Sequence, residues 1–420
     1  MTSAHVRQPQ HQPQTRPQPQ PLPFSVVAKP TGAACNLDCS YCFFLSKELL
    51  YDEKRQRMDK HTLENYIRQY LAASPDGPVV MLWQGGEPTM RGLEFFEKVV
   101  ELVDKLKRPT QIVSHSLQTN GTLITKKWAE FFKNNNFLVG VSLDGPAKYH
   151  DVYRINKAAM GTHKLVERGW RILQEHGVEL NLLCTVNAAN QDYPLETYRY
   201  FRDELGARHI QFIPIVERVD ASKLARAEIG WTTSELLYQQ KGDAITSRSV
   251  SPEKYGHFLN TIFDEWYSHD IGTVFIQDIE SALAGLFNSP TVCVHAPECG
   301  NNFAMEYNGD IYTCDHWVEP DYLIGNVNDN AAALSNQNIT NFHTAAQSAI
   351  MRDFATKKTT LSARCRSCDV RSFCNGGCPK DRFIKNGPDT ENYLCAGYHS
   401  FYTHIRPRLT YLARLVQAGM

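Results

Sequence analysis

Residues 35–42 read Cys-Asn-Leu-Asp-Cys-Ser-Tyr-Cys, and this stretch follows an apolar segment, 25–29, that has the pattern of a strand. Three closely spaced thiolates can hold three irons of a 4Fe–4S cube. No fourth cysteine lies nearby in the sequence, so one iron would stay open to a small chelating molecule. A structural zinc site is closed by four ligands. Zinc with a distant fourth ligand is the alternative for this stretch, and the motifs that follow it disfavour that alternative.

The 420-residue chain has an ordinary globular composition, with 42% hydrophobic residues, 21% charged residues and a formal net charge of −1. This charge balance gives no reason to expect a nucleic-acid partner. No apolar run reaches the roughly 20 residues that span a bilayer, so we expect no membrane association. The first 24 residues are rich in Gln and Pro and carry no secretory signal. Twelve cysteines in such a chain indicate metal binding or redox work rather than disulfides, and we expect a cytoplasmic protein.

From residue 24 onward, short apolar runs alternate with longer amphipathic stretches. The expected strands are 25–29, 79–83, 111–118, 138–143, 179–186 and 209–216. The expected helices between them are 63–73, 92–106, 126–133, 163–176 and 194–205. Strands separated by helices indicate βα units and a parallel sheet. Right-handed crossovers curl such a sheet toward a partial (β/α)6 TIM-like barrel, although the pattern also allows an open doubly wound sheet.

The composition divides the chain into five predicted parts. Residues 1–23 form a disordered Pro/Gln-rich tail, because they cannot bury enough apolar surface to fold. Residues 24–250 form the barrel, which ends in an irregular connection with one short helix near 234–241. Residues 251–290 form a helical connector that begins with a helix over 252–269. Residues 291–395 form a small cysteine-rich domain ordered largely by bound metal, with a partly helical stretch over 330–360. Residues 396–420 form a C-terminal helix.

Polar motifs follow the second, third and fourth predicted strands. They are Trp83-Gln-Gly-Gly-Glu-Pro88, Gln118-Thr-Asn-Gly121 and Ser142-Leu-Asp-Gly-Pro146, with His150-Asp-Val-Tyr-Arg154 close behind. Groups at the carboxyl ends of parallel strands point into one mouth, where α/β barrels bind ligands. The paired glycines would let the backbone approach a ligand closely, and Pro88 would fix the turn. Arg154 suits a carboxylate because its guanidinium can bind two oxygens at once.

The C-x3-C-x2-C spacing, followed by these motifs in this order, resembles the radical S-adenosylmethionine superfamily. In that superfamily the open iron binds the methionine end of S-adenosylmethionine, and one-electron reduction gives a 5′-deoxyadenosyl radical. The resemblance implies that Cys35, Cys39 and Cys42 hold a 4Fe–4S cluster. It also implies these contacts with S-adenosylmethionine: Tyr41 near the adenine, Gly86 and Glu87 at the methionine amino group, Ser142 and Arg154 at the ribose and the carboxylate, and Val216 as an apolar wall for the adenine.

Eight further cysteines lie in the C-terminal third of the chain. Two zinc ribbons are the alternative for them, because C-x2-C pairs are common there. The arrangement resembles the SPASM-type extension with two auxiliary 4Fe–4S clusters found in radical enzymes that modify peptides. That resemblance implies one cluster on Cys293, Cys299, Cys314 and Cys378 and another on Cys365, Cys368, Cys374 and Cys395, which makes three 4Fe–4S clusters in all. Cys184, on a predicted strand, is interpreted as a small buried apolar residue.

Within this group, everything after residue 24 resembles the anaerobic sulfatase-maturating enzymes. The resemblance includes Gln-Phe-Ile-Pro-Ile-Val-Glu at 211–217, Tyr-Thr-Cys-Asp-His at 312–316 and Cys-Asn-Gly-Gly-Cys-Pro-Lys-Asp at 374–381. These enzymes oxidise a cysteine or serine of a sulfatase to Cα-formylglycine. The resemblance implies hydrogen abstraction from Cβ, Asp315 as the base, and exit of an electron through an auxiliary cluster. It also implies a sulfatase polypeptide as partner and an electron donor such as a flavodoxin or ferredoxin.

Two other functions stay open. One is another peptide-modifying radical S-adenosylmethionine enzyme, for instance one that forms thioether crosslinks. Such enzymes often carry a peptide-binding domain before the barrel, and the tail of about 23 residues is too short for one. The other is a zinc-binding regulatory or nucleic-acid-binding protein, which the near-zero net charge disfavours. The sequence does not decide whether the target residue is cysteine or serine.

Overall fold

One mixed sheet organises the fold. The computed structural model describes residues 24–51, 56–232, 235–289, 291–329 and 340–418; the predicted tail, 1–23, lies outside the described residues. The sheet has ten strands in the order β12-β11-β10-β1-β2-β3-β4-β5-β6-β9. They are β1 (Phe24–Ala28), β2 (Gly77–Trp83), β3 (Gln111–Thr119), β4 (Phe137–Ser142), β5 (Glu179–Val186), β6 (His209–Pro214), β9 (Phe275–Ile276), β10 (Asn301–Met305), β11 (Asp310–Tyr312) and β12 (Leu323–Asn326).

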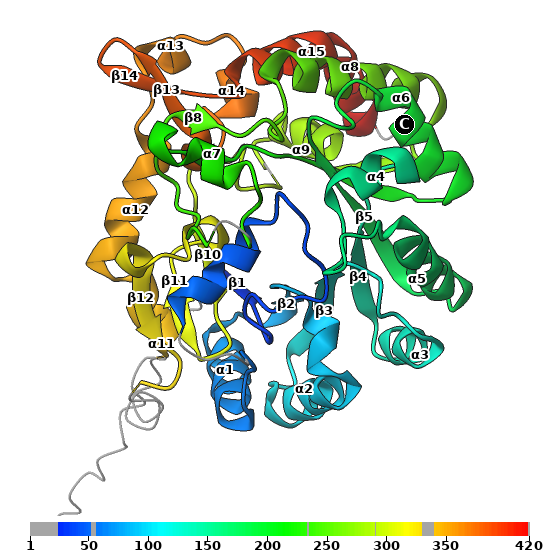
Figure 1. Cartoon of the computed structure of the whole chain (residues 1–420), viewed down its shortest axis with the longest axis vertical. Coiled ribbons are helices and arrows are strands. Elements are labelled where there is room, and N and C mark those ends of the chain that lie inside the picture. Colours follow the sequence, from blue (N-terminus) through cyan, green and yellow to red (C-terminus); the bar gives the residue numbers. More distant parts are fainter. Residues whose placement is uncertain (1–23, 52–55, 233–234, 290, 330–339, 419–420) are drawn as a thin grey trace, which may run out of the picture.

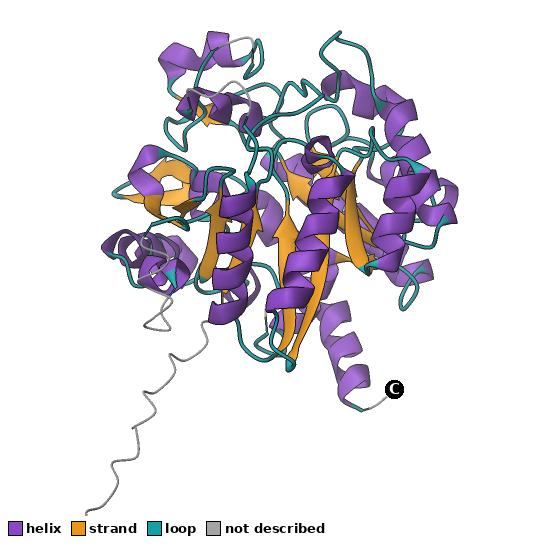
Figure 2. Ribbon diagram, turned by 90° about the horizontal axis from the view of Figure 1, so that it is seen from below, coloured by secondary structure: helices purple, strands orange, loops and turns teal. Residues whose placement is uncertain are grey.

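The predicted parallel barrel is confirmed. The six predicted strands are β1 to β6, and their ends differ from the prediction by two residues or fewer. These strands pair in parallel and in sequence order. They curve around the centre of the molecule (Figure 1), and helices cover the outer face of the sheet (Figure 2). Within the described residues the edge strands β12 and β9 do not pair with each other. The sheet is therefore a partial barrel rather than a closed barrel or a flat doubly wound sheet.

Amphipathic helices cover the barrel. They are α1 (Lys60–Ala73), α2 (Leu93–Leu106), α3 (Lys126–Asn134), α4 (Ala147–Tyr153), α5 (His163–Glu175) and α6 (Pro194–Arg199). In α5, the side chains of Val166, Trp170 and Leu173 recur at helical spacing and are buried. At the start of α1, the Asp59 carboxylate accepts a hydrogen bond from Thr62 N, which caps the helix. The sequence pattern located α1, α2, α3, α5 and α6 because one face of each is committed to the core, whereas α4 was not among the predicted helices.

The short helix predicted near 234–241 is wrong for the described residues. Residues 235–241 are not helical, and the nearest helix is α7 (Leu224–Ala227). Glu235 has a φ of 51°, in the left-handed region that interrupts a helix. The backbone groups of Tyr238 and Gln240 bond to side chains of other elements instead of to a helical ladder. Contacts with distant residues therefore keep this polar stretch from forming the helix that its sequence weakly favours. In addition, two residue pairs, β7 (Arg218–Val219) and β8 (Ala244–Ile245), form a small ladder in this connection.

The C-terminal region continues the barrel sheet instead of standing apart from it. β10 pairs in parallel with β1, and β11 and β12 follow as antiparallel strands. The predicted connector contains the expected helix α8 (Pro252–His269), and also β9 and α9 (Gln277–Gly285). The remaining elements are α11 (Asn341–Ala346), α12 (Ala349–Thr359), α13 (Ala363–Arg366), α14 (Arg371–Cys374), the hairpin β13 (Arg382–Asn386) and β14 (Asp389–Asn392), and α15 (Cys395–Gln417). Strand pairing therefore joins the C-terminal region to the edge of the barrel sheet at β1.

Candidate functional site

A cavity of about 290 Å³ lies at the carboxyl ends of the barrel strands. Its lining joins residues from opposite ends of the sequence. It includes these predicted site residues: Cys35, Cys39, Tyr41, Cys42, Gly86, Ser142, Arg154, Val216, Asp315 and Cys378. Two regions far apart in the sequence therefore share one chamber because β10 pairs with β1. The cavity brings the first cysteine cluster and Asp315 together, as the sequence analysis predicts for a common site.

The first cysteine cluster is a buried group of thiols. Cys39 packs with Leu37 and Tyr41, and Cys35 and Cys42 border the same cluster. Burial raises the pKa of the Cys35 thiol to about 12. Such thiols become ligands only when a cation stabilises the thiolate. Within the described residues, no three cysteine sulfurs of the chain lie within 4.8 Å of one another.

The paired glycines pack the turn after β2 against the cysteine loop. A Cβ on Gly86 would lie 2.1 Å from the carbonyl oxygen of Ala34, so only glycine fits there. Gly86 N donates to Gly32 O, and Glu87 N donates to Ala34 O. The glycines therefore admit the backbone of the cysteine loop, whereas the sequence analysis expected them to admit a ligand. The Glu87 carboxylate is buried and accepts from Thr89, Thr119 and Asn120. It does not line the cavity, and its predicted contact with a ligand stays a prediction.

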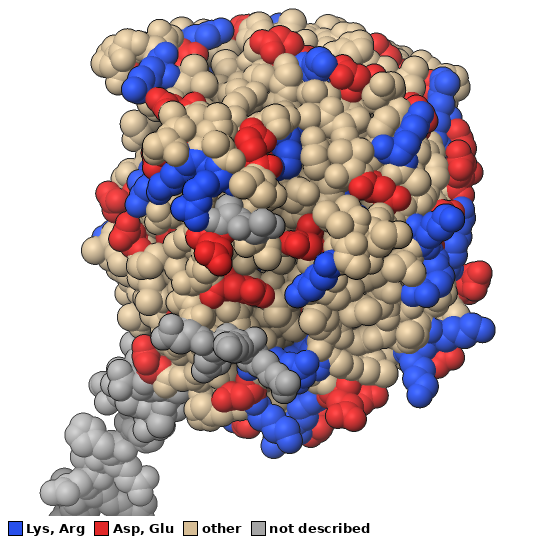
Figure 3. All heavy atoms as spheres, viewed as in Figure 1, with Lys and Arg blue, Asp and Glu red and all other residues tan. Residues whose placement is uncertain are grey.

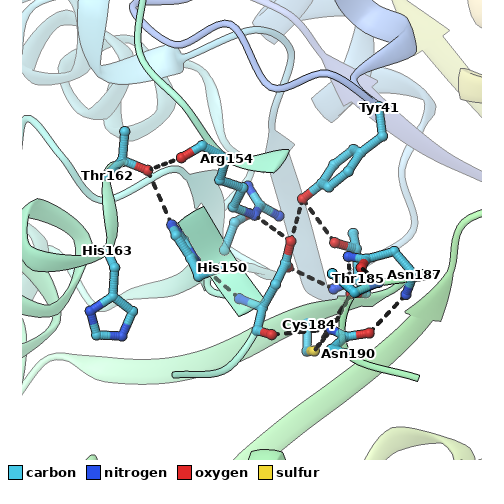
Figure 4. Close-up of polar contacts among 12 residues, drawn as sticks. Tyr41, His150, Arg154, Thr162, His163, Cys184, Thr185, Asn187 and Asn190 are labelled. Atoms are coloured by element: carbon cyan, nitrogen blue, oxygen red, sulfur yellow. Dashed lines mark hydrogen bonds and ion pairs between the residues drawn. The ribbon is translucent and has the colours of Figure 1, made fainter. Parts of the chain in front are cut away.

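A buried carboxylate orients two of the predicted ligand-binding side chains. Asp144 Oδ2 accepts from Arg154 Nε at 2.9 Å and from the Tyr41 hydroxyl at 2.5 Å (Figure 4). Asp144 Oδ1 accepts from Thr185 N at 2.9 Å. Although burial opposes ionisation, the Arg154 guanidinium keeps the pKa of Asp144 below its ordinary value. Within the described residues the side-chain hydrogen bond of Arg154 uses Nε and not the Nη atoms, and its guanidinium carbon lies 5.5 Å from the centroid of the Tyr41 ring. Arg154 therefore presents two free donors at the cavity in a fixed orientation.

Asp315 belongs to a buried ionic triad that the sequence analysis missed. Lys29 Nζ lies 2.9 Å from Asp315 Oδ1 and 3.0 Å from Glu306 Oε1, and 4.3 Å above the ring of Phe44. Burial alone would lower the pKa of Lys29, but the two carboxylates outweigh it and raise that pKa. Glu306 is buried, whereas the Asp315 side chain is 20% exposed and reaches the cavity. The cation therefore holds Asp315 in place at the cavity wall.

Lys29→Met should lower the free energy of unfolding by about 3–5 kcal/mol, because it leaves Glu306 and Asp315 without their cation. Urea unfolding followed by circular dichroism measures the change. Adding Glu306→Gln should restore part of the loss, since one of the two uncompensated charges then disappears. The exposed Lys105→Met serves as the control on α2. A Lys29→Met variant as stable as that control would contradict the inferred role of the triad.

The C-terminal cysteines form two groups. Cys365, Cys368, Cys374 and Cys395 line one small cavity under α15. Cys378 lines the large cavity with Asp315. Cys378 and Cys293 both act electrostatically on the thiol of Cys314, and Cys293 acts on that of Cys299. Burial raises the pKa of Cys374 and Cys378 to about 12. One predicted set of four therefore lines a common cavity, and the assignment of Cys293, Cys299, Cys314 and Cys378 to one cluster stays a prediction. Cys184 is buried on β5 and stands apart from both sets.

Two cations, the buried Lys358 and the partly buried Arg382, lie among these thiols. Lys358 Nζ donates to Val294 O and Gly377 O, each at 2.6 Å, next to Cys293 and Cys378. Arg382 donates to the carbonyls of Asn375, Gly376 and Gly377, which lie between Cys374 and Cys378. Burial lowers the pKa of both side chains, and the nearby cysteines oppose that shift. Buried positive charge of this kind needs a negative partner, which a thiolate-bound cluster supplies.

Residues missed by the sequence analysis share one property. Lys29, Glu306 and Lys358 are charged, and they gain a role only through partners distant in the sequence. A weak signal existed for Lys29, because it follows a buried strand and precedes Pro30 at the barrel mouth. No local pattern could pair it with Asp315. On the molecular face in Figure 3, acidic and basic side chains are interspersed. Within the described residues no helix combines the length and apolar content needed to cross a bilayer.

The chain is similar to known proteins in both sequence and structure. The Radical SAM superfamily profile matches residues 30–201. The chain is 41% identical over 397 residues to a serine-type anaerobic sulfatase-maturating enzyme of Bacteroides thetaiotaomicron, covering 93% of this chain and 92% of that one. It is 31% identical to a cysteine-type enzyme of Clostridium perfringens, covering 94% and 100%. The solved structure of anSMEcpe with bound AdoMet and the Cp18Cys peptide has a TM-score of 0.79, 29% identity and coverage of 94% and 99%. The chain belongs to the family of anaerobic sulfatase-maturating enzymes.

Proposed function

We propose that this chain uses S-adenosylmethionine and iron–sulfur clusters to oxidise a cysteine or serine of a sulfatase polypeptide to Cα-formylglycine. The observation that carries the proposal is the shared cavity, with Cys35, Cys39 and Cys42 at one side and Asp315 and Cys378 at another. A relative with bound AdoMet and peptide has the same fold over nearly the whole chain. A radical generator, a base and an electron exit can therefore serve one substrate side chain.

The donor sets fit three 4Fe–4S clusters. Cys35, Cys39 and Cys42 supply three thiols, which leaves one iron open for S-adenosylmethionine. We assign Cys293, Cys299, Cys314 and Cys378 to one auxiliary cluster and Cys365, Cys368, Cys374 and Cys395 to the other. Lys358 and Arg382 supply compensating positive charge next to these thiols.

The cavity residues suit the parts of S-adenosylmethionine. Bound at the open iron and reduced by one electron, this cofactor supplies the radical chemistry. The free Nη donors of Arg154 suit a carboxylate. Ser142 receives a hydrogen bond from Gln118 and lines the same wall, where a ribose hydroxyl would find a partner. Tyr41 and Val216 border the cavity near the adenine position that the family pattern implies. We assign Gly86 and Glu87 to the methionine end, with Glu87 acting through the turn that it stabilises.

The oxidation has a simple balance. A cysteine side chain loses one hydrogen atom from Cβ, one proton from the thiol and one further electron, and water then replaces sulfur as hydrogen sulfide. A serine side chain loses the same three particles and yields the aldehyde directly. We assign the proton to the Asp315 carboxylate, which reaches the cavity and is held by Lys29. We assign the electron to the cluster on Cys378, because that cysteine lines the same cavity.

We infer the partners from this chemistry. A sulfatase segment must enter in an extended or unfolded form, because the reacting side chain has to reach a cavity of about 290 Å³. A low-potential electron donor such as a flavodoxin or ferredoxin would supply the reducing electron. A cytoplasmic location fits twelve cysteines of which none forms a disulfide, since reducing conditions keep cysteines from pairing.

One experiment tests the function. Anaerobically reconstituted, reduced protein is mixed with S-adenosylmethionine and, side by side, a cysteine- and a serine-containing sulfatase peptide. We expect 5′-deoxyadenosine and a formylglycine product from at least one peptide, detected by chromatography and mass spectrometry. Formation of a thioether crosslink instead of an aldehyde would contradict the proposal. A protein that binds zinc and no iron would contradict it as well.

A further inference from the structure

The segment Tyr238, Gln239 and Gln240, here called the strap, forms part of the cavity wall. The side chains of Tyr238 and Gln240 line the cavity and are buried, whereas Gln239 lies outside it and is partly exposed. The strap belongs to the stretch where the sequence favoured a helix, and it is not helical: Lys241 N donates to Gln239 O at 2.8 Å, which turns the backbone at Gln240.

Side chains from three other parts of the fold hold the strap backbone. Tyr238 N donates to Ser46 Oγ at 3.0 Å, and Lys47 Nζ donates to Tyr238 O at 2.7 Å. Gln240 N donates to Glu319 Oε1 at 2.9 Å, and the Arg218 guanidinium donates to Gln240 O. The inward-facing residues therefore have their backbone donors and acceptors satisfied without a neighbouring strand.

Two buried charged residues, Lys47 and Glu319, hold the strap backbone. Lys47 and Glu319 are each 1% exposed, and neither lines the cavity. Burial lowers the pKa of Lys47 to about 8, which the nearby Glu319 opposes. Burying a lysine and a glutamate costs free energy that only specific partners recover. Lys47 and Glu319 both bond to the strap backbone, so two buried charged side chains fix the position of the strap.

The strap spans the two sides of the reaction site. Ser46 and Lys47 lie on η1 (Phe43–Leu50), which begins directly after Cys42. Glu319 follows Asp315 by four residues, and Gln240 Nε2 donates to His316 O at 3.3 Å. The Phe43 ring lies 5.6 Å from that of Tyr238 and 5.9 Å from that of His316, between ring centroids. The strap is thus anchored both to the cysteine loop and to the Asp315 turn.

We propose that the strap is a specificity-determining wall of the substrate cavity, which holds an extended peptide so that its target Cβ lies between the cysteine loop and Asp315. The inference rests on the proposed function and adds to it the residues that position the substrate. Tyr238 supplies an aromatic ring, and its hydroxyl donates to Gln240 Oε1 at 3.5 Å. Gln240 Nε2 donates one N–H to His316 O, so the amide keeps a second N–H and a second oxygen lone pair for a peptide backbone. The side chains that bond to the strap backbone hold the strap in one position. A bound peptide is therefore already aligned with both the cysteine loop and Asp315.

Gln240→Ala and Gln239→Ala form a matched pair, because both residues belong to the strap and only Gln240 lines the cavity. In reduced, cluster-loaded enzyme with excess peptide, Gln240→Ala should raise the 5′-deoxyadenosine formed per aldehyde by about 10- to 100-fold, as expected for a misplaced reacting side chain. Gln239→Ala should leave this ratio unchanged. Without reduction, binding of a fluorescent peptide to the enzyme with S-adenosylmethionine should weaken about tenfold for Gln240→Ala only, a change of about 1.4 kcal/mol.

S-adenosylmethionine affinity distinguishes a wall from a general defect. It should be the same in both variants and in Lys47→Met, which loosens the strap without touching the cavity lining. Lys47→Met should raise the same product ratio as Gln240→Ala. If the ratio of 5′-deoxyadenosine to aldehyde stayed unchanged in Gln240→Ala and Lys47→Met while the wild type formed aldehyde normally, only the proposed role of the strap would be overturned. A wild type that cleaves S-adenosylmethionine yet forms no aldehyde from either peptide would overturn the proposed function, and the wall with it.

Discussion

Asp315→Asn should lower the rate of aldehyde formation by about 10²- to 10⁴-fold, the usual contribution of a general base, while cleavage of S-adenosylmethionine continues. The amide has the same shape as the carboxylate and keeps an oxygen for Lys29, but it cannot accept a proton. Hydrogen abstraction does not require the base, so 5′-deoxyadenosine should accumulate without formylglycine. Quantifying both products in one reaction measures the effect.

Glu306→Gln is the matched control for this prediction. Glu306 is the other carboxylate on Lys29, at 3.0 Å, and it does not line the cavity. The variant removes the same charge from the same triad, so any loss caused by the electrostatics of the triad alone should appear in both variants. We expect aldehyde formation to persist in Glu306→Gln. Equal losses in the two variants would show that Asp315 acts through the triad and is not the base.

Periodicity and spacing predicted most of the barrel, because its strands and helices each commit one face to the core. β5 was located to the residue, and α8 likewise. The alternation of polar motifs with strands also predicted which residues meet at the mouth, since parallel strands end at the same edge. Ser142 and Arg154 share the cavity for that reason. Such features are local, and a single sequence contains them.

Features that depend on distant partners could not be predicted. The pairing of β10 with β1 joins residues nearly 280 positions apart, such as Ser25 and Asn302. Without that pairing, the sequence gives no reason for Lys29 to meet Glu306 and Asp315. The helix predicted over the strap was wrong for a related reason. The strap backbone bonds to the side chains of Lys47 and Glu319 instead of forming helical hydrogen bonds. The close packing of Gly86 against the Ala34 carbonyl could not be predicted either, because no local pattern reveals it.

Cys39→Ala should abolish cleavage of S-adenosylmethionine and remove about four of roughly twelve irons per chain, because the cluster on Cys35, Cys39 and Cys42 has no spare ligand. Without that cluster no radical forms, so neither 5′-deoxyadenosine nor aldehyde should appear. Iron analysis, the visible spectrum with and without S-adenosylmethionine, and product quantification measure the three consequences.

Two further cysteine variants give this prediction its specificity. Cys184→Ala removes a buried thiol on β5 that belongs to no cysteine group, so iron content and both products should stay at wild-type levels. Cys368→Ala removes a ligand assigned to the cluster under α15, so iron should fall while the spectral response to S-adenosylmethionine persists. The three variants together distinguish the radical-generating cluster from a cluster that carries electrons. Cys39→Ala removes the first, Cys368→Ala disturbs the second, and Cys184→Ala leaves both unchanged. Cleavage of S-adenosylmethionine by Cys39→Ala at the wild-type rate would contradict the assignment of the radical-generating cluster, and with it the whole arrangement of the cavity around an open iron.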